Sequence, residues 1–184
     1  MVTRIYLTGF MTSGKSTLGQ ILANVLGWNF YDLDKELEKD ESQKVSEIFE
    51  TKGEKYFRKI ESVKLEQLSK SDNSIIALGG GTLINDDNLK IILQTGKLVY
   101  LKVTPEIIYK RIKNKIDRPL FRDFVLAGNS KEQFIKKIEG MLEERNKYYN
   151  KADIFFNVDD SPIGITVDRL AKLIKKIIYE KNTH

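Results

Sequence analysis

Near its N-terminus the chain reads Gly9-Phe10-Met11-Thr12-Ser13-Gly14-Lys15-Ser16-Thr17, which matches the P-loop pattern G-x-x-x-x-G-K-[ST]. An apolar run at 5–7 precedes this segment, and a helical pattern over 15–26 follows it. In such a setting the backbone N–H groups of the loop and the positive end of the helix dipole bind phosphate. We therefore predict nucleotide binding, with Lys15 reaching the β- and γ-phosphates and the Ser16 hydroxyl as a ligand of Mg²⁺.

The composition excludes several kinds of chemistry. The 184 residues include no cysteine, and the only histidine is His184 at the end of the chain. Disulfides, thiolate metal sites and histidine bases are therefore excluded, so proton transfer falls to carboxylates, Lys or Tyr. Any metal should be a hard cation with oxygen ligands, such as Mg²⁺.

The charge pattern is that of a solvated surface. The net charge is +5, but only seven of the 31 basic residues are arginines, and the lysines alternate with glutamates in helical segments. We therefore expect no nucleic-acid partner. No apolar run approaches the length of a membrane span and the N-terminus is unlike a signal peptide, which predicts a cytoplasmic protein without a membrane partner.

Short apolar runs alternate with amphipathic segments along the chain, which favours a single α/β domain over 1–184. We predict strands at 5–8, 29–32, 74–78, 98–102 and 154–158. We predict helices at 15–26, 33–40, 45–69, 86–94, 105–113, 131–149 and 163–179. Strands separated by helices indicate a parallel, doubly wound sheet with both faces covered. The aperiodic segment at about 114–130 is predicted to be a mobile lid.

Two carboxylates follow the second predicted strand, in Asp32-Leu33-Asp34. The strand over 74–78 ends without an acid, so we expect Asp32 or Asp34 to serve the metal and the other to serve the acceptor hydroxyl. One of them could instead cap the next helix. The Gly79-Gly80-Gly81 segment removes side chains directly after a predicted strand and allows a ligand or another backbone to approach.

The scarcity of arginine suggests that each one is placed for its fork-shaped guanidinium. Arg58 and Arg145 are candidates for gripping a carboxylate, although Arg58 and Glu61 could form only a surface pair. Arg118, in the predicted lid, is a candidate for stabilising the transferring phosphoryl group. Arg111 is a candidate for stacking on adenine.

Several short motifs now combine into one pattern. In chain order they are the P-loop at 9–17, Asp32-Leu33-Asp34, Gly53-Glu54, Phe57-Arg58 with Glu61, Gly79-Gly80-Gly81, Arg118-Pro119-Leu120, and Arg145 with Tyr148. Over nearly its whole length the chain resembles the shikimate kinases. The resemblance implies an α/β three-layer P-loop fold like that of nucleoside monophosphate kinases, with a five-stranded parallel sheet in the order 2-3-1-4-5. It also implies a segment at about 33–62 that binds shikimate.

The implied reaction is ATP- and Mg²⁺-dependent phosphorylation of the shikimate 3-hydroxyl, in chorismate and aromatic amino acid biosynthesis. We expect the enzyme to act as a monomer. The implied catalytic residues are Lys15, Asp34 and Arg118. The implied ATP-binding residues are Thr12, Ser13, Gly14, Lys15, Ser16, Thr17, Arg111 and Arg118. The implied shikimate-binding residues are Asp34, Arg58, Gly79, Gly80, Gly81 and Arg145, and Ser16 and Asp32 are the implied Mg²⁺ ligands.

The chain also departs from the family pattern. Thr12 stands where many relatives have glycine, the segment from Arg118 to Arg145 is longer than is common, and the turn at 159–162 lacks an arginine. Arg122 competes with Arg118 for the closing role. Two alternatives stay open: a kinase for another small polyol acid such as gluconate, and a P-loop module that binds nucleotide without turnover.

Overall fold

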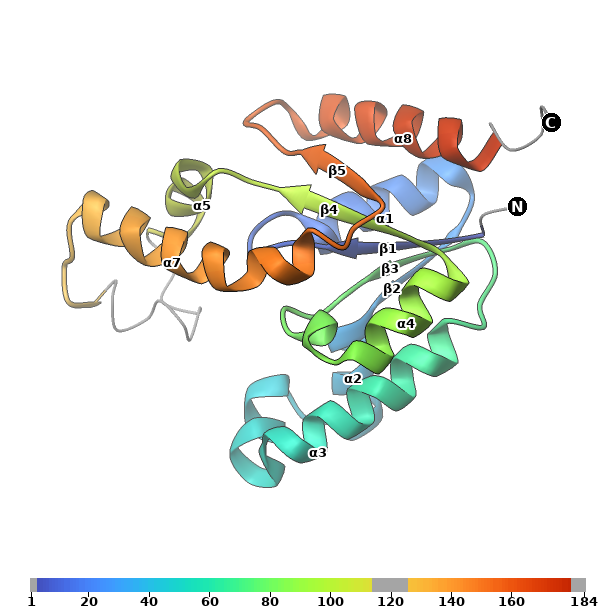
Figure 1. Cartoon of the computed structure of the whole chain (residues 1–184), viewed down its shortest axis with the longest axis horizontal. Coiled ribbons are helices and arrows are strands. Elements are labelled where there is room, and N and C mark those ends of the chain that lie inside the picture. The colour runs from blue at the N-terminus through green and yellow to red at the C-terminus, as the bar shows by residue number, and fades with distance from the viewer. Residues whose placement is uncertain (1–2, 114–125, 180–184) are drawn as a thin grey trace.

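The computed structural model describes residues 3–113 and 126–179, and within them a five-stranded parallel sheet forms the centre of the molecule (Figure 1). The strands are β1 (Arg4–Thr8), β2 (Asn29–Asp32), β3 (Ser74–Ala77), β4 (Lys97–Lys102) and β5 (Ile154–Asn157). Their order in the sheet is β2-β3-β1-β4-β5. This confirms the predicted α/β fold and strand order, and each strand end lies within one residue of its prediction.

Helices cover both faces of the sheet (Figure 1). They are α1 (Lys15–Leu26), α2 (Leu33–Glu41), α3 (Val45–Leu68), α4 (Asp86–Thr95), α5 (Pro105–Ile112), α7 (Lys131–Tyr149) and α8 (Ile163–Tyr179), with the short 3₁₀ helix η1 (Thr82–Ile84). These seven α-helices of the described residues were expected from the sequence, whereas η1 was not.

The core consists of two apolar layers, one on each face of the sheet. Ile5 and Leu7 of β1 pack with residues of α1 and α8, whereas Tyr6 packs with residues of α2, α3 and α4. Successive side chains of a strand point to opposite faces, so a strand covered on both sides is apolar throughout. Each fully buried Leu or Ile contributes about 1.5–3 kcal/mol.

The register of the parallel strands aligns their carboxyl ends. Asp32 of β2 pairs with Ala77 of β3, and Leu7 of β1 pairs with both Ala77 and Val99 of β4. The loops that follow β1, β2 and β3 therefore leave the sheet side by side. In open α/β sheets this edge is where ligands bind.

Helix α3 is interrupted rather than continuous. Gly53 has φ 78° and ψ 168°, which lies outside the helical region, so a second helical segment begins at Glu54. Only glycine adopts such a conformation at little cost. The sequence predicted one helix over 45–69 and did not predict this break.

Other helix boundaries follow ordinary capping rules. Thr104 caps α5 by accepting the Ile107 N–H, with Pro105 in the first turn as predicted. Ser130 and Gln133 form a capping box at the start of α7. In the described parts of the chain, no helix combines the length and the apolar character that crossing a membrane requires.

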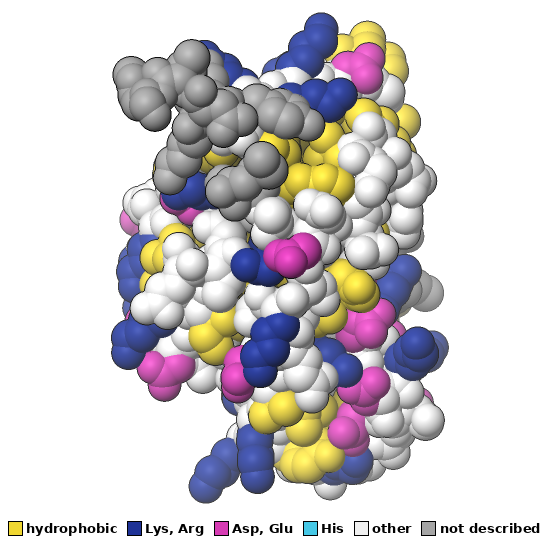
Figure 2. Space-filling view, turned by 90° about the vertical axis from the view of Figure 1, so that its right-hand side faces the viewer, with side chains coloured by type: hydrophobic (Ala, Val, Ile, Leu, Met, Phe, Trp, Pro, Cys, Tyr) yellow, Lys and Arg dark blue, Asp and Glu magenta, His cyan; other side chains and the backbone are white. Residues whose placement is uncertain are grey.

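The outer surface carries a mixture of both charges. On the face seen in Figure 2, Lys and Arg side chains are interspersed with Asp and Glu, and apolar groups lie among them. Ion pairs in which both side chains are exposed, such as Lys70–Glu66 and Lys90–Asp87, contribute about 0–1 kcal/mol each. The Arg58–Glu61 pair is much less exposed, because the Glu61 side chain is 1% exposed.

Candidate functional site

One cavity of about 1390 Å³ lies at the carboxyl edge of the sheet. One end is lined by the P-loop and by the turn after β5, and the other end by α2, the first part of α3 and Arg58. Asp32, Asp34, Gly80 and Arg145 also line it. The cavity therefore brings together predicted site residues that are more than a hundred positions apart in the sequence.

The P-loop needs its two glycines for different reasons. Gly14 caps α1 with φ 98°, in the left-handed region that favours glycine. At Gly9 a Cβ atom would lie 2.7 Å from the backbone oxygen of Leu101, so the neighbouring strand leaves no room for a side chain. Lys15 donates from Nζ to the backbone oxygens of Gly9 at 2.9 Å and Phe10 at 3.4 Å, so its ammonium group lies close to the loop.

Thr12 occupies a backbone conformation that glycine would adopt more easily. Its φ is 61°, which for a β-branched residue is a strained left-handed conformation. Its carbonyl accepts a hydrogen bond of 2.8 Å from Nη1 of Arg111, whose Nη2 lies 3.5 Å from the carbonyl of Asp159. Arg111 thus braces the P-loop against the turn after β5, on the wall of the cavity where we predicted adenine.

Asp32 caps the next helix and also contacts the P-loop serine. Its Oδ1 accepts the Lys35 N–H at 3.4 Å as the cap of α2, and its Oδ2 accepts the Ser16 hydroxyl at 2.5 Å. The predicted pair of metal ligands is therefore joined directly. Mg²⁺ typically takes one or two protein oxygens together with phosphate and water, and a hydroxyl beside a carboxylate at the P-loop fits that preference.

Asp34 is a buried carboxylate with a strongly raised pKa. Burial, together with the negative charges of Asp32 and Glu61 and against the opposing charge of Lys15, raises its pKa from 3.8 to about 6. A carboxylate with a pKa near the working pH is suited to accept a proton. Asp34 lies in the first turn of α2 and lines the cavity.

Two of the three glycines after β3 leave room for side chains of the protein. A Cβ at Gly79 would lie 2.7 Å from Oδ1 of Asp34, and one at Gly81 would lie 2.5 Å from Nη2 of Arg58. Of the three, only Gly80 lines the cavity. The close approach predicted at this segment therefore occurs, but Asp34 and Arg58 make it.

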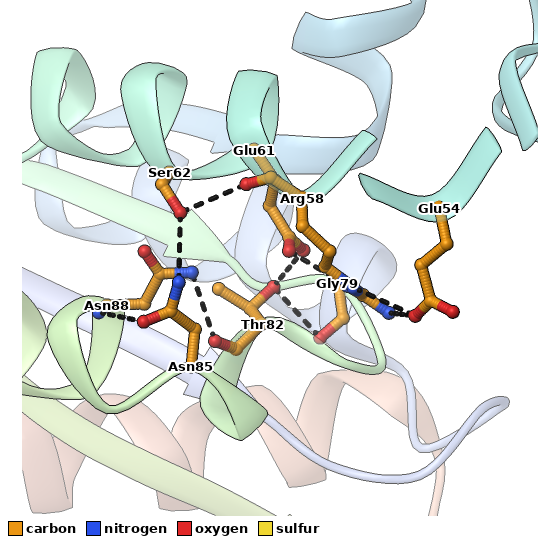
Figure 3. A network of polar contacts seen from close by, with 8 residues as sticks. All are labelled: Glu54, Arg58, Glu61, Ser62, Gly79, Thr82, Asn85 and Asn88. Carbon is orange, nitrogen blue, oxygen red and sulfur yellow. Dashed lines mark hydrogen bonds and ion pairs between the residues drawn. The ribbon is translucent and has the colours of Figure 1, made fainter. Parts of the chain in front are cut away.

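Arg58 is held in a network of polar contacts (Figure 3). Its Nη1 donates to Oε2 of Glu61 at 2.8 Å, and the hydroxyl of Thr82 donates to the other oxygen of Glu61 at 2.7 Å. The Glu61 side chain is only 1% exposed. A buried carboxylate with partners on both oxygens fixes the guanidinium, so this pair is more than a surface ion pair.

Arg145 approaches the same glycine segment from α7. Its Nη1 would lie 3.5 Å from a Cβ at Gly80, and its guanidinium lies over the ring of Phe10 at 5.3 Å. Arg58 and Arg145 therefore flank neighbouring residues of one loop. Two guanidinium groups in this arrangement suit a small anionic ligand.

Sequence reasoning missed several residues of this end of the cavity. Phe49 lines the cavity and packs on Phe57 with ring centroids 4.6 Å apart, and Glu38 lines the cavity while accepting the Val45 N–H at 3.0 Å. The role of Thr82 also gave no signal in the sequence, since a lone threonine after glycines has no distinctive pattern. Arg118, Arg122 and most of the predicted lid lie outside the described residues.

A P-loop, a carboxylate with a raised pKa and a pair of guanidinium groups in one cavity define a P-loop kinase for a small molecule. The comparisons with known proteins specify which family. The model of the shikimate kinase family matches residues 11–178, and the chain belongs to this family.

Relatives and solved structures agree with this assignment. A shikimate kinase of Chloroherpeton thalassium is 42% identical over 174 residues, covering 95% of this chain and 93% of its own length. The shikimate kinase structure from Bacteroides thetaiotaomicron has a TM-score of 0.82 at 34% identity, covering 94% of this chain and 98% of its own. The structure from Acinetobacter baumannii, in complex with shikimate, has a TM-score of 0.81 at 29% identity, covering 100% and 97%.

Proposed function

We infer that this chain transfers a phosphoryl group from ATP to shikimate, at the 3-hydroxyl, giving shikimate 3-phosphate and ADP. Membership of the shikimate kinase family supports the reaction. The observation that carries it in this molecule is the position of Asp34 in a cavity with a P-loop at one end and Arg58 with Arg145 at the other. Shikimate is a small anionic polyol, so it needs both a carboxylate site and a group that accepts a hydroxyl proton.

The donor end would bind ATP mainly through backbone groups. The N–H groups of residues 12–17 and the dipole of α1 favour the phosphates, and Lys15 supplies a positive charge beside them. Ser16 and Asp32 would hold Mg²⁺. When bound, Mg²⁺ neutralises charge that develops on the phosphate oxygens. Arg111 would flank adenine, since it lines the cavity beside the turn after β5.

The acceptor end would position the hydroxyl rather than activate it strongly. Arg58 and Arg145 would bind the carboxylate of shikimate, and Gly80, which lines the cavity, would contact the ring hydroxyls. Asp34 would accept the proton of the attacking hydroxyl as that oxygen bonds to phosphorus and the bond to the leaving ADP oxygen breaks. Catalysis then rests on orientation and on stabilised charge.

Three further assignments complete the proposal. Residues 33–62 would form the shikimate-binding segment, because Asp34, Arg58 and the cavity-lining residues Glu38 and Phe49 all belong to it. The segment at about 114–130, with Arg118, keeps its predicted role as a lid that would exclude water. We also propose that the chain acts as a monomer, since one copy supplies both ends of the cavity.

The test is a coupled assay of ADP release with ATP and Mg²⁺. Turnover with shikimate should exceed turnover with gluconate, nucleoside monophosphates or no acceptor by at least about a hundredfold. Equal rates across these acceptors would refute a shikimate kinase. Salt-sensitive retention on DNA without shikimate-stimulated ADP release would instead favour a non-catalytic nucleotide-binding module.

A further inference from the structure

The guanidinium of Arg58 lies between two carboxylates that contact different edges of it (Figure 3). On one edge, Nη1 donates to Glu61 at 2.8 Å. On the other edge, Nε and Nη2 both donate to a single oxygen of Glu54, each at 3.3 Å. The proposed function needs this arginine to bind the carboxylate of the acceptor, so the carboxylates already present affect that binding.

The two carboxylates are not equivalent. Glu61 is 1% exposed and its second oxygen accepts the Thr82 hydroxyl, so it cannot leave without a large desolvation cost. Glu54 is 67% exposed, and its two contacts with Arg58 are long and share one oxygen. An exposed ion pair of this kind contributes little and exchanges readily with solvent. Glu61 is therefore a permanent partner and Glu54 a replaceable one.

Arg58 does not need Glu54 to stay in place. Its guanidinium lies 5.9 Å from the ring of Phe49 and 5.4 Å from that of Phe57. The backbone at Gly81 closes on it so tightly that no Cβ fits there. With Glu61 on one edge, these contacts already define the orientation of the side chain.

We propose that Glu54 is a specificity-determining residue, whose carboxylate occupies the Nε/Nη2 edge of Arg58 until the carboxylate of the acceptor replaces it. The proposal rests on the proposed function of this site. With both glutamates in place, the charge of Arg58 is more than balanced, so an anionic acceptor must compete for it. Glu54 therefore lowers the affinity of the site for an anionic acceptor. Only an acceptor that carries a carboxylate of its own can replace Glu54 on Arg58.

The break in α3 gives the displaced side chain a favourable position. Because Gly53 leaves the helical region, Glu54 is the first residue of the second helical segment. Backbone N–H groups at a helix start lack partners within the helix, and the positive end of the dipole favours a carboxylate there. When Glu54 releases Arg58, the Glu54 carboxylate therefore still interacts favourably with the start of this helical segment.

The test compares the wild-type chain with E54Q by steady-state kinetics and by calorimetric titration with shikimate. The variant should bind shikimate about two- to fivefold more tightly and show a correspondingly lower KM for shikimate, with the KM for ATP unchanged within about a third. The gain should shrink as salt is raised, because the opposing charge is exposed. E66Q, which removes the partner of an exposed i,i+4 lysine farther along α3, is the matched control and should leave both constants unchanged.

The methyl ester of shikimate lacks the negative charge. It therefore distinguishes competition between two carboxylates for Arg58 from an effect of Glu54 on the binding of any acceptor. E54Q should not improve binding of the ester. A KM for shikimate that is unchanged or raised in E54Q, or an equal gain for the ester, would overturn the proposal. If the wild-type chain fails to phosphorylate shikimate at all, the proposed function fails instead, and the two results are separate.

Discussion

The phosphate end of the cavity, which the P-loop lines, comes mainly from one continuous segment, whereas the acceptor end is assembled from four separate parts of the chain. At the phosphate end, residues 9–17 supply the loop, its glycines and the helix start in one continuous segment. At the acceptor end, Asp34, Arg58, Gly80 and Arg145 come from α2, α3, the loop after β3 and α7.

The difference lies in what fixes each geometry. Steric limits at Gly9 and Gly14 shape the phosphate end, and the conformation follows from local sequence. A buried network fixes the acceptor end, in which Thr82 holds Glu61 and Glu61 holds Arg58. A change at the phosphate end should therefore act locally, whereas a change at the acceptor end should alter acceptor binding through several residues.

Asp34 is the proposed proton acceptor at the acceptor end, and its substitution should have the largest effect. Asp34→Asn removes the proton acceptor, so we expect kcat to fall by about 10²- to 10⁴-fold with both KM values nearly unchanged. In the wild-type chain, kcat/KM should rise with pH through about 6, as the Asp34 carboxyl loses its proton, and level off above. Asp87→Asn, at an exposed surface pair, should leave these profiles unchanged. A pH-independent kcat/KM between pH 5 and 7.5 would contradict the role of Asp34.

The same substitution should stabilise the fold. The folded chain raises the pKa of Asp34 from 3.8 to about 6, so its contribution to stability is fully present below pH 3.8 and is lost as the pH rises through 6. Above that pH the buried charge costs on the order of 1–3 kcal/mol, which Asn avoids. Thermal unfolding should therefore show a Tm gain for Asp34→Asn that is larger at pH 8 than at pH 5.

Arg58→Lys tests whether the acceptor end acts separately from the phosphate end. Lysine keeps the charge but loses the fork and the stacking on Phe57 and Gly81. We expect the KM for shikimate to rise by about 10- to 100-fold, with the KM for ATP within about twofold of the wild type. Steady-state kinetics with each substrate varied in turn measures both, and an equal loss for ATP would show that the two ends are not separate.

Thr12→Gly should have the smallest effect. Glycine relieves the left-handed strain at φ 61°, but it also increases the conformational entropy of the unfolded chain. We therefore expect the free energy of unfolding to rise by at most about 1 kcal/mol. The KM for ATP should change by less than about twofold, because Arg111 bonds to the backbone carbonyl of this residue. Thr12→Ala keeps the strain and is the matched control in thermal unfolding. A similar gain in both variants would show that strain is not the cause.

Most of the fold could be predicted from the sequence, because the signals are local. Alternating apolar runs and helical patterns placed every strand and α-helix end within about a residue, and Thr104 with Pro105 marked the start of α5. The phosphate end of the cavity could also be predicted, because the P-loop pattern is a continuous segment of sequence. The break at Gly53 gave no such signal, because a glycine inside a helical pattern is often tolerated.

The acceptor end could be predicted only in part. Arg58, Arg145 and Asp34 were identified as candidates, and the structure places all three around one cavity. Which groups hold Arg58 depends on contacts across α3 and η1, and no local pattern specifies them. The sequence also predicted a close approach at Gly79 and Gly81, but it did not show that the side chains of Asp34 and Arg58 are the groups that approach.

The continuity of the cavity has a consequence for inhibitor design. Its volume of about 1390 Å³ exceeds the roughly 300–1,000 Å³ of typical small-molecule pockets, because it spans both substrate regions without an intervening wall. A compound that joins a nucleotide mimic to an anionic ring by a short tether therefore has a direct path between Lys15 and Arg58. Tethering makes binding of the second part intramolecular, so two weak fragments gain affinity from the high effective concentration of each near its site.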